Sequence, residues 1–265
     1  CVYETVISMK TNDLKNLAKK SVAKIISDDS NFSKLPFNHL YIDNFFSPEF
    51  ANALLDNFPK LDNKALWDIS NDPEIEVKMR SKWQSEFDIP DTIVDAIRVL
   101  NSSLFLKSVS EKFDIPKLMP DPYFTGGGLN VTVSGGLLDV HIDGNYHDAS
   151  GLNRRINAIL YLNPGWQEGW GGEFGLYDET GDKLIKKIAP IHNRLVIFDT
   201  NDKSFHGLPD PLNFPEGHAR RSIILYYYTK DERPSYQVTV NEPHSALWKK
   251  KGGLDKRGNK TRDFS

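Results

Sequence analysis

Cysteine is almost absent from this chain: Cys1 is the only one among 265 residues. A single cysteine cannot form a disulfide within the chain, and it cannot build a cysteine-based zinc site. Any bound metal must therefore be held by histidine and carboxylate side chains. Sparse cysteine also fits a reducing compartment, so we expect a cytoplasmic location.

Long apolar runs are also missing. No stretch of 18 or more apolar residues occurs, so we expect no membrane-spanning helix and no membrane partner. The opening residues, CVYETVISMK, lack a basic region followed by an apolar one, and we expect no secretory signal peptide.

An excess of positive charge is lacking over most of the chain. The net charge is -3, so a nucleic-acid partner is not expected. From Trp248 onward, however, seven basic residues accompany two acidic ones. We expect a basic tail over residues 245–265 that is solvated and mobile, with docking to an anionic partner as the alternative.

Apolar residues make up 39% of the chain and aromatic residues 11%, enough for a sizeable core. Apolar periodicity and capping residues predict helices over 12–27, 48–58 and 91–113, and a strand over 36–46. Beyond about residue 120, β-forming segments alternate with turn residues, which is typical of an antiparallel sandwich or barrel. The predicted strands are 129–135, 137–143, 155–163, 171–178, 193–199, 221–229 and 236–240.

The segment HIDGNYH, residues 141–147, holds a candidate metal site. On a strand, residues two apart face the same side, so His141 and Asp143 can share one metal ion. Roughly 0.6 His-x-Asp triplets are expected by chance in this composition, so one occurrence is no surprise and the pair needs a further ligand. His206, just after the apolar segment 193–199, is the candidate.

Arg220 and Ser222 also lie two residues apart, at the start of the strand predicted over 221–229. A guanidinium and a hydroxyl on one face suit a carboxylate, which arginine can bind through two charge-assisted hydrogen bonds. Two imidazoles and one carboxylate form the facial ligand set of non-haem Fe(II) oxygenases. Zinc could bind the same ligands, but an anion site beside it has no obvious role in a hydrolase.

Several motifs resemble a known family. HIDG, RINAILYLNPGW with GGEFGLYD, NRLVIFDTNDKSFHG and RRSIILYYY occur in the order seen in Fe(II)/2-oxoglutarate-dependent dioxygenases of the prolyl 4-hydroxylase-like superfamily, over about residues 128–230. The segment PFNHLYIDNFFSPE resembles the opening of soluble bacterial and phage members. Each motif alone is weak, but their order makes the resemblance specific.

The resemblance implies a fold that is mostly β with N-terminal helices, an α+β protein built on a double-stranded β-helix of the jelly-roll or cupin-like kind. It implies one oxygenase domain over 1–265, with an N-terminal layer over about 1–119 and the β-helix core over about 120–240. His141, Asp143 and His206 would bind Fe(II). Arg220, Ser222 and Tyr161 would bind the distal carboxylate of 2-oxoglutarate, with Arg221 as the alternative anchor if the strand register slips by one residue.

The implied reaction consumes 2-oxoglutarate and O2 and releases succinate and CO2 as an unactivated C–H bond is hydroxylated, with ascorbate as a possible supporting reductant. Related halogenases lack the carboxylate ligand, so Asp143 indicates hydroxylation. The substrate would be a prolyl residue of a protein or peptide, or a small metabolite. A metal-binding jelly roll without turnover, acting as a sensor or binding module, is the alternative from another class. A nucleic-acid demethylase is a third.

The other candidate residues have weaker cases. His147 could be a further metal ligand, and Asp139 could face the metal, although a structural role is favoured for both. The segments 74–83 and 207–219 are candidate lids over the metal. Residues that could contact substrate are Tyr123, Trp166, Trp170 and His218. Those expected to be ordinary surface or core histidines are His39, His192 and His244.

Overall fold

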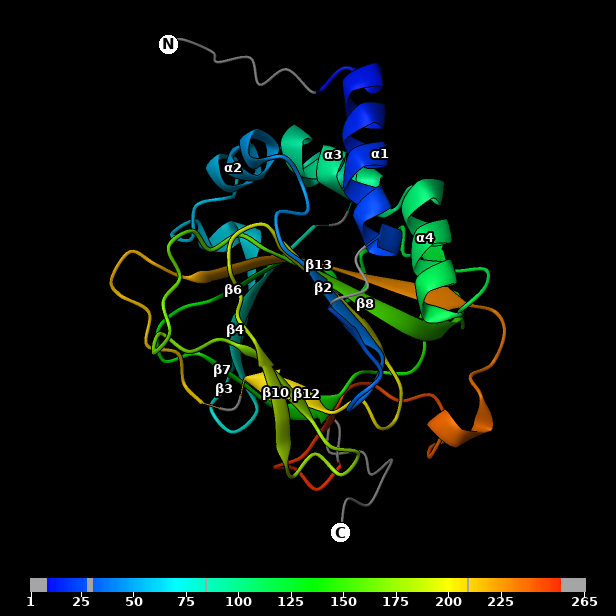
Figure 1. Ribbon diagram of the computed structural model, residues 1–265. Coiled ribbons are helices and arrows are strands. Elements are labelled where there is room, and N and C mark those ends of the chain that lie inside the picture. Colours follow the sequence, from blue (N-terminus) through cyan, green and yellow to red (C-terminus); the bar gives the residue numbers. More distant parts are fainter. Residues whose placement is uncertain (1–8, 28–30, 84, 209, 254–265) are drawn as a thin grey trace.

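The computed structural model describes residues 9–27, 31–83, 85–208 and 210–253 (Figure 1). Helices gather on one side of a large curled sheet, in which every described strand pair is antiparallel. The helices are α1 (Thr11–Ser27), α2 (Pro48–Asp56), α3 (Asp91–Leu100) and α4 (Ser103–Phe113). The strands are β1 (Phe32–Ser33), β2 (His39–Ile42), β3 (Trp67–Asp72), β4 (Glu76–Ser81), β5 (Met119–Pro120), β6 (Gly128–Thr132), β7 (Leu137–Ile142), β8 (Asn153–Tyr161), β9 (Phe174–Tyr177), β10 (Leu184–Ile188), β11 (Arg194–Asp199), β12 (His206–Leu208), β13 (Arg220–Thr229) and β14 (Leu247–Trp248). The expected class, mostly β with N-terminal helices, is confirmed.

The two faces of β13 belong to two different cores. Ile223, Leu225 and Tyr227 pack with residues of the helices in the main apolar core. Ile224, which alternates with them, packs against a second apolar cluster on the other face. Burial on both faces explains why β8 and β13 are nearly continuous apolar runs.

The second cluster shows that the sheet curls back on itself. Its members include Tyr161 of β8 and Phe198 of β11, together with Phe174 and Leu176 of β9. In the strand order β1-β2-β11-β8-β13-β6-β4-β7-β12-β9-β10, β9 is far from β8 and β11. Their side chains can meet only because the ends of the sheet approach each other. This inner face is where the candidate metal ligands lie.

The helical predictions hold with one correction. The Ser47 side chain caps α2 by accepting a hydrogen bond from the Phe50 N–H, and Pro48 occupies the first turn. The helix predicted over 91–113 is instead two helices. The Ser102 hydroxyl caps α4 by accepting from the Phe105 N–H, because serine competes for backbone hydrogen bonds and favours a new helix start over continuation.

Two strand predictions are wrong. The strand expected over 36–46 is confined to β2, because the chain turns at Asn44, whose φ is 50°. The strand expected over 236–240 does not form, since Ser235–Gln237 is a short 3-10 helix. The backbone N–H groups of Thr239 and Val240 instead donate to the buried Asp202 carboxylate, which replaces the sheet partner.

The segment 74–83 is not a lid. It forms β4, which pairs with β3 in a hairpin and lies between β6 and β7 in the sheet. Alternation along 67–81 is weak because both strands carry many charged residues, and the pattern therefore did not predict strands.

The start of the basic tail is ordered, contrary to expectation. Leu247 and Trp248 form β14, which pairs with β7. The three lysines that follow each meet a carboxylate on another segment: Lys249–Asp182 at 3.2 Å, Lys250–Asp139 at 4.0 Å and Lys251–Asp72 at 2.8 Å. Residues 254–265 lie outside the described residues. Of the helices in the described ranges, none is long and apolar enough to cross a membrane.

Candidate metal centre

His141, Asp143 and His206 converge on one point. His141 of β7 and His206 of β12 are directly opposite each other in antiparallel register, with ring centroids 4.4 Å apart. The Asp143 carboxylate lies between them, 3.7 Å from Nε2 of each imidazole. One ligand atom from each residue lies within 4.8 Å of the others, a spacing that suits a single metal ion.

Backbone carbonyls hold both imidazoles in the orientation that a metal requires. Nδ1 of His141 donates to the Asp139 carbonyl and Nδ1 of His206 donates to the Ser204 carbonyl, each at 2.8 Å. These hydrogen bonds fix the proton on Nδ1 and leave the Nε2 lone pair directed toward the centre. Both rings are buried, and so is the Asp143 side chain, which is 9% exposed.

The protonation states also suit a metal. Burial, together with neighbouring His141, lowers the pKa of His206 to about 4, so this imidazole is neutral near pH 7. Burial alone would raise the pKa of the Asp143 carboxyl, but His206, His141 and the charge of Arg154 hold it well below its ordinary value. The centre therefore offers two imidazole nitrogens and one carboxylate, a donor set that fits Fe(II).

A second buried site lies on β13 and β8, which β6 and β4 separate from β7 in the strand order. The Arg220 guanidinium donates to the Tyr161 hydroxyl at 3.0 Å and to the Gly172 carbonyl at 2.7 Å. No carboxylate within the described ranges lies at ion-pair distance from Arg220. Ser222, opposite Tyr161 in the sheet, is fully buried, and its Oγ has no hydrogen-bond partner.

These three side chains fit a carboxylate. A buried guanidinium and an unsatisfied buried hydroxyl are both unfavourable unless an anion binds between them. Gly172 permits this arrangement, because a Cβ there would lie 2.9 Å from the Arg220 side chain. The predicted set of Arg220, Ser222 and Tyr161 is thus brought together on the inner face.

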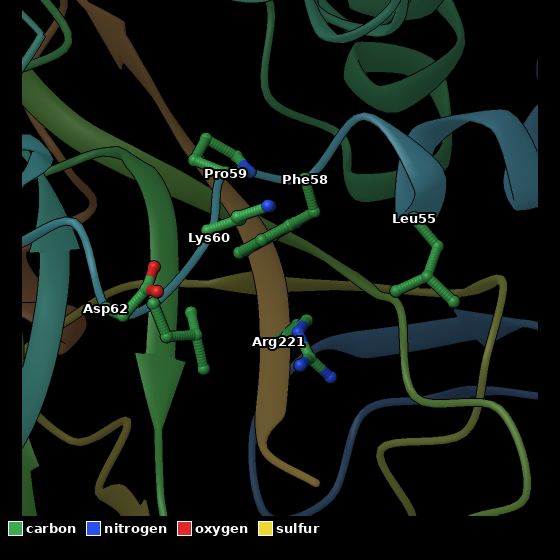
Figure 2. Close-up of a pocket in the computed structure, with 7 residues that line it drawn as sticks. Leu55, Phe58, Pro59, Lys60, Asp62 and Arg221 are labelled. Carbon is green, nitrogen blue, oxygen red and sulfur yellow. The ribbon is translucent and has the colours of Figure 1, made fainter. Parts of the chain in front are cut away.

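Arg221 points away from this site, as its alternation with Arg220 predicts. Its guanidinium carbon lies 6.0 Å from the centroid of the Phe58 ring, on the helical side of the sheet. Figure 2 shows it lining a pocket of about 480 Å³ with residues of the segment that follows α2. The register did not slip, and Arg220 is the inward-facing residue.

The remaining histidines do not join the ligands. Nε2 of His147 donates to the Asp121 carboxylate at 2.8 Å, while two backbone N–H groups donate to its Nδ1, so His147 links two loops. His39 contacts Lys186, and His244 lies 3.4 Å from Asp202. His218 is on the surface and packs on Trp170. Asp139 is buried and accepts a hydrogen bond from the Lys250 N–H.

Two residues near the metal ligands were missed from the sequence. Trp248 of β14 is directly opposite His141, and its ring stacks on that imidazole at 4.6 Å with an angle of 29°. Arg154 of β8 lies over the Tyr226 ring at 4.0 Å and acts electrostatically on Asp143. Neither has a motif, since sequence neighbours do not reveal cross-strand partners. The one available signal was that Tyr226 lies four residues after Ser222 on the same strand, so its ring faces the same side as Ser222 and could be expected near the site.

Comparison with known proteins agrees with this geometry. Residues 127–228, which carry all three candidate metal ligands and Arg220, match the model of the 2OG-Fe(II) oxygenase superfamily. This match covers less than half of the chain, and over it the chain is similar to that superfamily, in agreement with the expected family.

Two curated relatives are also prolyl hydroxylases by name. The chain is 36% identical over 86 residues to prolyl 3-hydroxylase OGFOD1 of Mus musculus, covering 31% of this chain and 15% of that protein. It is 34% identical over 106 residues to the Xenopus laevis protein, covering 37% of this chain and 20% of the other. The chain thus matches at most a fifth of the length of these relatives.

Solved structures share the fold over more of the chain. A prolyl hydroxylase from Trichoplax adhaerens, solved with a peptide fragment of the hypoxia inducible factor oxygen degradation domain, superposes with a TM-score of 0.57 at 19% identity, covering 83% of this chain and 94% of the other. A Pseudomonas putida prolyl-4-hydroxylase gives 0.53 at 16% identity, covering 78% and 98%. The jelly-roll fold expected from the motifs is confirmed.

Proposed function

We propose that this protein is an Fe(II)- and 2-oxoglutarate-dependent dioxygenase that hydroxylates an unactivated C–H bond and releases succinate and CO2. The observation that carries the proposal is the joint presence of the two sites. Three metal-ligand atoms lie within 4.8 Å of one another, and a buried arginine, tyrosine and unsatisfied serine lie on the same inner face.

In this proposal His141, Asp143 and His206 hold Fe(II), and three ligands leave the other positions open for the cosubstrate and O2. Arg220, Ser222 and Tyr161 bind the distal carboxylate of 2-oxoglutarate. The iron and the cosubstrate supply the oxidative chemistry, whereas the protein orients them and excludes water. Burial of the ligands and of Tyr161 supports that last role.

The substrate we propose is a prolyl residue in a protein or peptide. The names of the relatives, prolyl 3-hydroxylases and prolyl 4-hydroxylases, support this choice. The same chemistry on a small metabolite remains the second candidate, because substrate-binding walls vary among proteins that share a fold.

We also propose that residues 1–265 form one oxygenase domain that works in the cytoplasm. One apolar core joins Val22 of α1, Phe105 of α4 and Tyr227 of β13, which supports a single folding unit. The single cysteine supports a reducing compartment, in which iron is kept as Fe(II).

Succinate release tests the proposal. The purified protein is incubated with Fe(II), 2-oxoglutarate, ascorbate and short proline-containing peptides, and succinate and peptide mass are followed together. We expect succinate formation and a mass increase of one oxygen atom on the peptide. Metal binding without any succinate in the presence or absence of peptide would instead identify a sensor or binding module.

A further inference from the structure

Strand β4 turns a charged face toward the metal centre. Residues directly opposite in antiparallel strands point to the same side of the sheet. Tyr161 pairs with Ser222, Ser222 with Asn130, and Asn130 with Arg80. Arg80 therefore lies in one row with the proposed cosubstrate residues, on the inner face. Lys78 and Glu76 alternate with the outward-facing Val77 and Met79 and share the face of Arg80.

Electrostatic interactions support this placement of both cations on the face of the metal ligands. Burial and the charge of Asp143 raise the pKa of Tyr226, whereas Arg154 and Arg80 act in the opposite direction. The charge of Lys78 also lowers the pKa of His206, although burial and neighbouring His141 lower it more. Arg80 and Lys78 thus approach the centre from a strand outside the segment that matches the family.

Both cations are accessible while the metal ligands are not. The Arg80 side chain is 41% exposed and the Lys78 side chain 24%, against 9% or less for the three ligands. A substrate that reaches the centre from solvent past β4 would therefore meet these cations before it meets the metal. This position suits a residue that selects the substrate.

The charge on this face is not balanced by the protein. Glu76 is paired with Lys78 at 3.0 Å, and the single carboxylate of Asp68 is shared by Arg80 at 3.5 Å and Lys82 at 3.7 Å. Arg154 has no carboxylate at ion-pair distance in the parts of the chain that the structure describes. With metal and cosubstrate bound as proposed above, the charge of Asp143 is neutralised by the metal and that of Arg220 by the cosubstrate carboxylate. The other charged residues on this face then carry more positive than negative charge.

We propose that Arg80, supported by Lys78, forms a carboxylate subsite beside the metal centre, and that the substrate carries a carboxylate next to the residue that is hydroxylated. This inference rests on the proposed function, since it names a chemical feature of the substrate for the same site. The carboxylate can belong to an acidic side chain in a peptide or to a small acid such as a free imino acid. Arginine suits this role because its planar group binds carboxylates with two hydrogen bonds.

The test compares carboxylates with matched amides. Binding to the protein loaded with Fe(II) and 2-oxoglutarate without oxygen is measured by calorimetry at low ionic strength. One pair of probes is the end-blocked peptide Gly-Asp-Pro-Gly and its Asn counterpart; the other is N-acetylproline and N-acetylprolinamide. We expect the carboxylate to bind about fivefold more tightly in at least one pair, with the preference shrinking at high salt. The pair that shows the preference tells the peptide source from the small acid.

Arg80 is the residue to change, because its partner Asp68 is half exposed and keeps Lys82, whereas removing Lys78 would leave the buried Glu76 without that cation. In Arg80→Gln, the ratio of the amide Kd to the carboxylate Kd should fall close to one. In Arg80→Glu, the amide should bind more tightly than the carboxylate. Lys117→Gln is the control, since Lys117 is an exposed cation whose partner Asp231 is itself exposed. The control should keep the full preference.

Equal affinities within both pairs, no binding of any probe, or a preference that survives Arg80→Glu would each overturn the carboxylate subsite. The proposed function is judged separately, by succinate release and by the visible absorption of the Fe(II)–2-oxoglutarate complex. A protein that gives that absorption but shows no carboxylate preference retains the function and loses only this inference.

Discussion

At the scale of single residues, buried histidines in and near the metal centre have different roles. His141 and His206 each use one nitrogen for a backbone carbonyl and keep the other for the metal, whereas His147 uses both nitrogens to link two loops. The HIDG motif and the later histidine made the ligand set predictable, because residues two apart on a strand share a face. The sequence could not tell whether His206 would be opposite His141, since register is a property of the folded sheet.

Replacement of the carboxylate ligand is the sharpest change at one residue. Asp143→Ala should abolish 2-oxoglutarate consumption, because two imidazoles alone hold an open metal site poorly, while the fold stays intact by circular dichroism. His147→Gln serves as the control, since it alters a buried imidazole outside the ligand set, and it should retain turnover. Full 2-oxoglutarate consumption by Asp143→Ala would show that the ligand assignment is wrong.

Ser222 offers a test of the cosubstrate site that is separate from the metal. Its buried Oγ has no partner in the protein, so Ser222→Ala should leave the melting temperature unchanged. If this hydroxyl binds the carboxylate of 2-oxoglutarate, its loss removes a hydrogen bond to a charged group, about 1.5 kcal/mol or more. The Kd for 2-oxoglutarate, measured by calorimetry, should rise at least about tenfold. An unchanged Kd would remove Ser222 from the site.

At the scale of elements, β7 is the strand on which the centre is built. It pairs with β12, which supplies the second histidine, and with β4 and β14 along its length. β7 was predicted from its alternating apolar residues. β14 was not predicted, because its two apolar residues are followed directly by three lysines. Short strands stabilised by ion pairs to distant carboxylates leave no periodic pattern for the sequence to reveal.

Trp248 of β14 should support metal binding through His141. Trp248→Ala removes the ring that stacks on this imidazole and should raise the Kd for Co(II) or Fe(II) about tenfold, an effect typical of residues that orient metal ligands. It should also lower the free energy of unfolding by about 3 kcal/mol through the cavity it leaves.

Leu247→Ala is the matched control for that loss of stability. Leu247 is equally buried but packs with Val140 and Ile142 in a separate apolar cluster. It should destabilise the protein by a similar amount while metal affinity stays the same. Equal metal affinity in both variants would show that the Trp248 ring has only a structural role.

At the scale of the whole molecule, the order of the segments and the class of the fold were readable from the sequence. The helices and most central strands follow from apolar periodicity, caps and turn residues. Residues 74–83, which form β4, were misread as a lid, because this strand alternates charged residues with few apolar ones. The curl that brings β9 near β8 depends on packing between distant segments, so local patterns could not give it.

The central claim is that His141, Asp143 and His206 bind Fe(II) together with 2-oxoglutarate. The most direct measurement is an anaerobic titration of the metal-free protein with Fe(II) and then 2-oxoglutarate, followed by visible absorption. We predict a weak charge-transfer band that saturates at one equivalent of each and is absent from a folded His206→Ala variant. A folded wild-type protein without the band, or the same band in His206→Ala, would contradict the account.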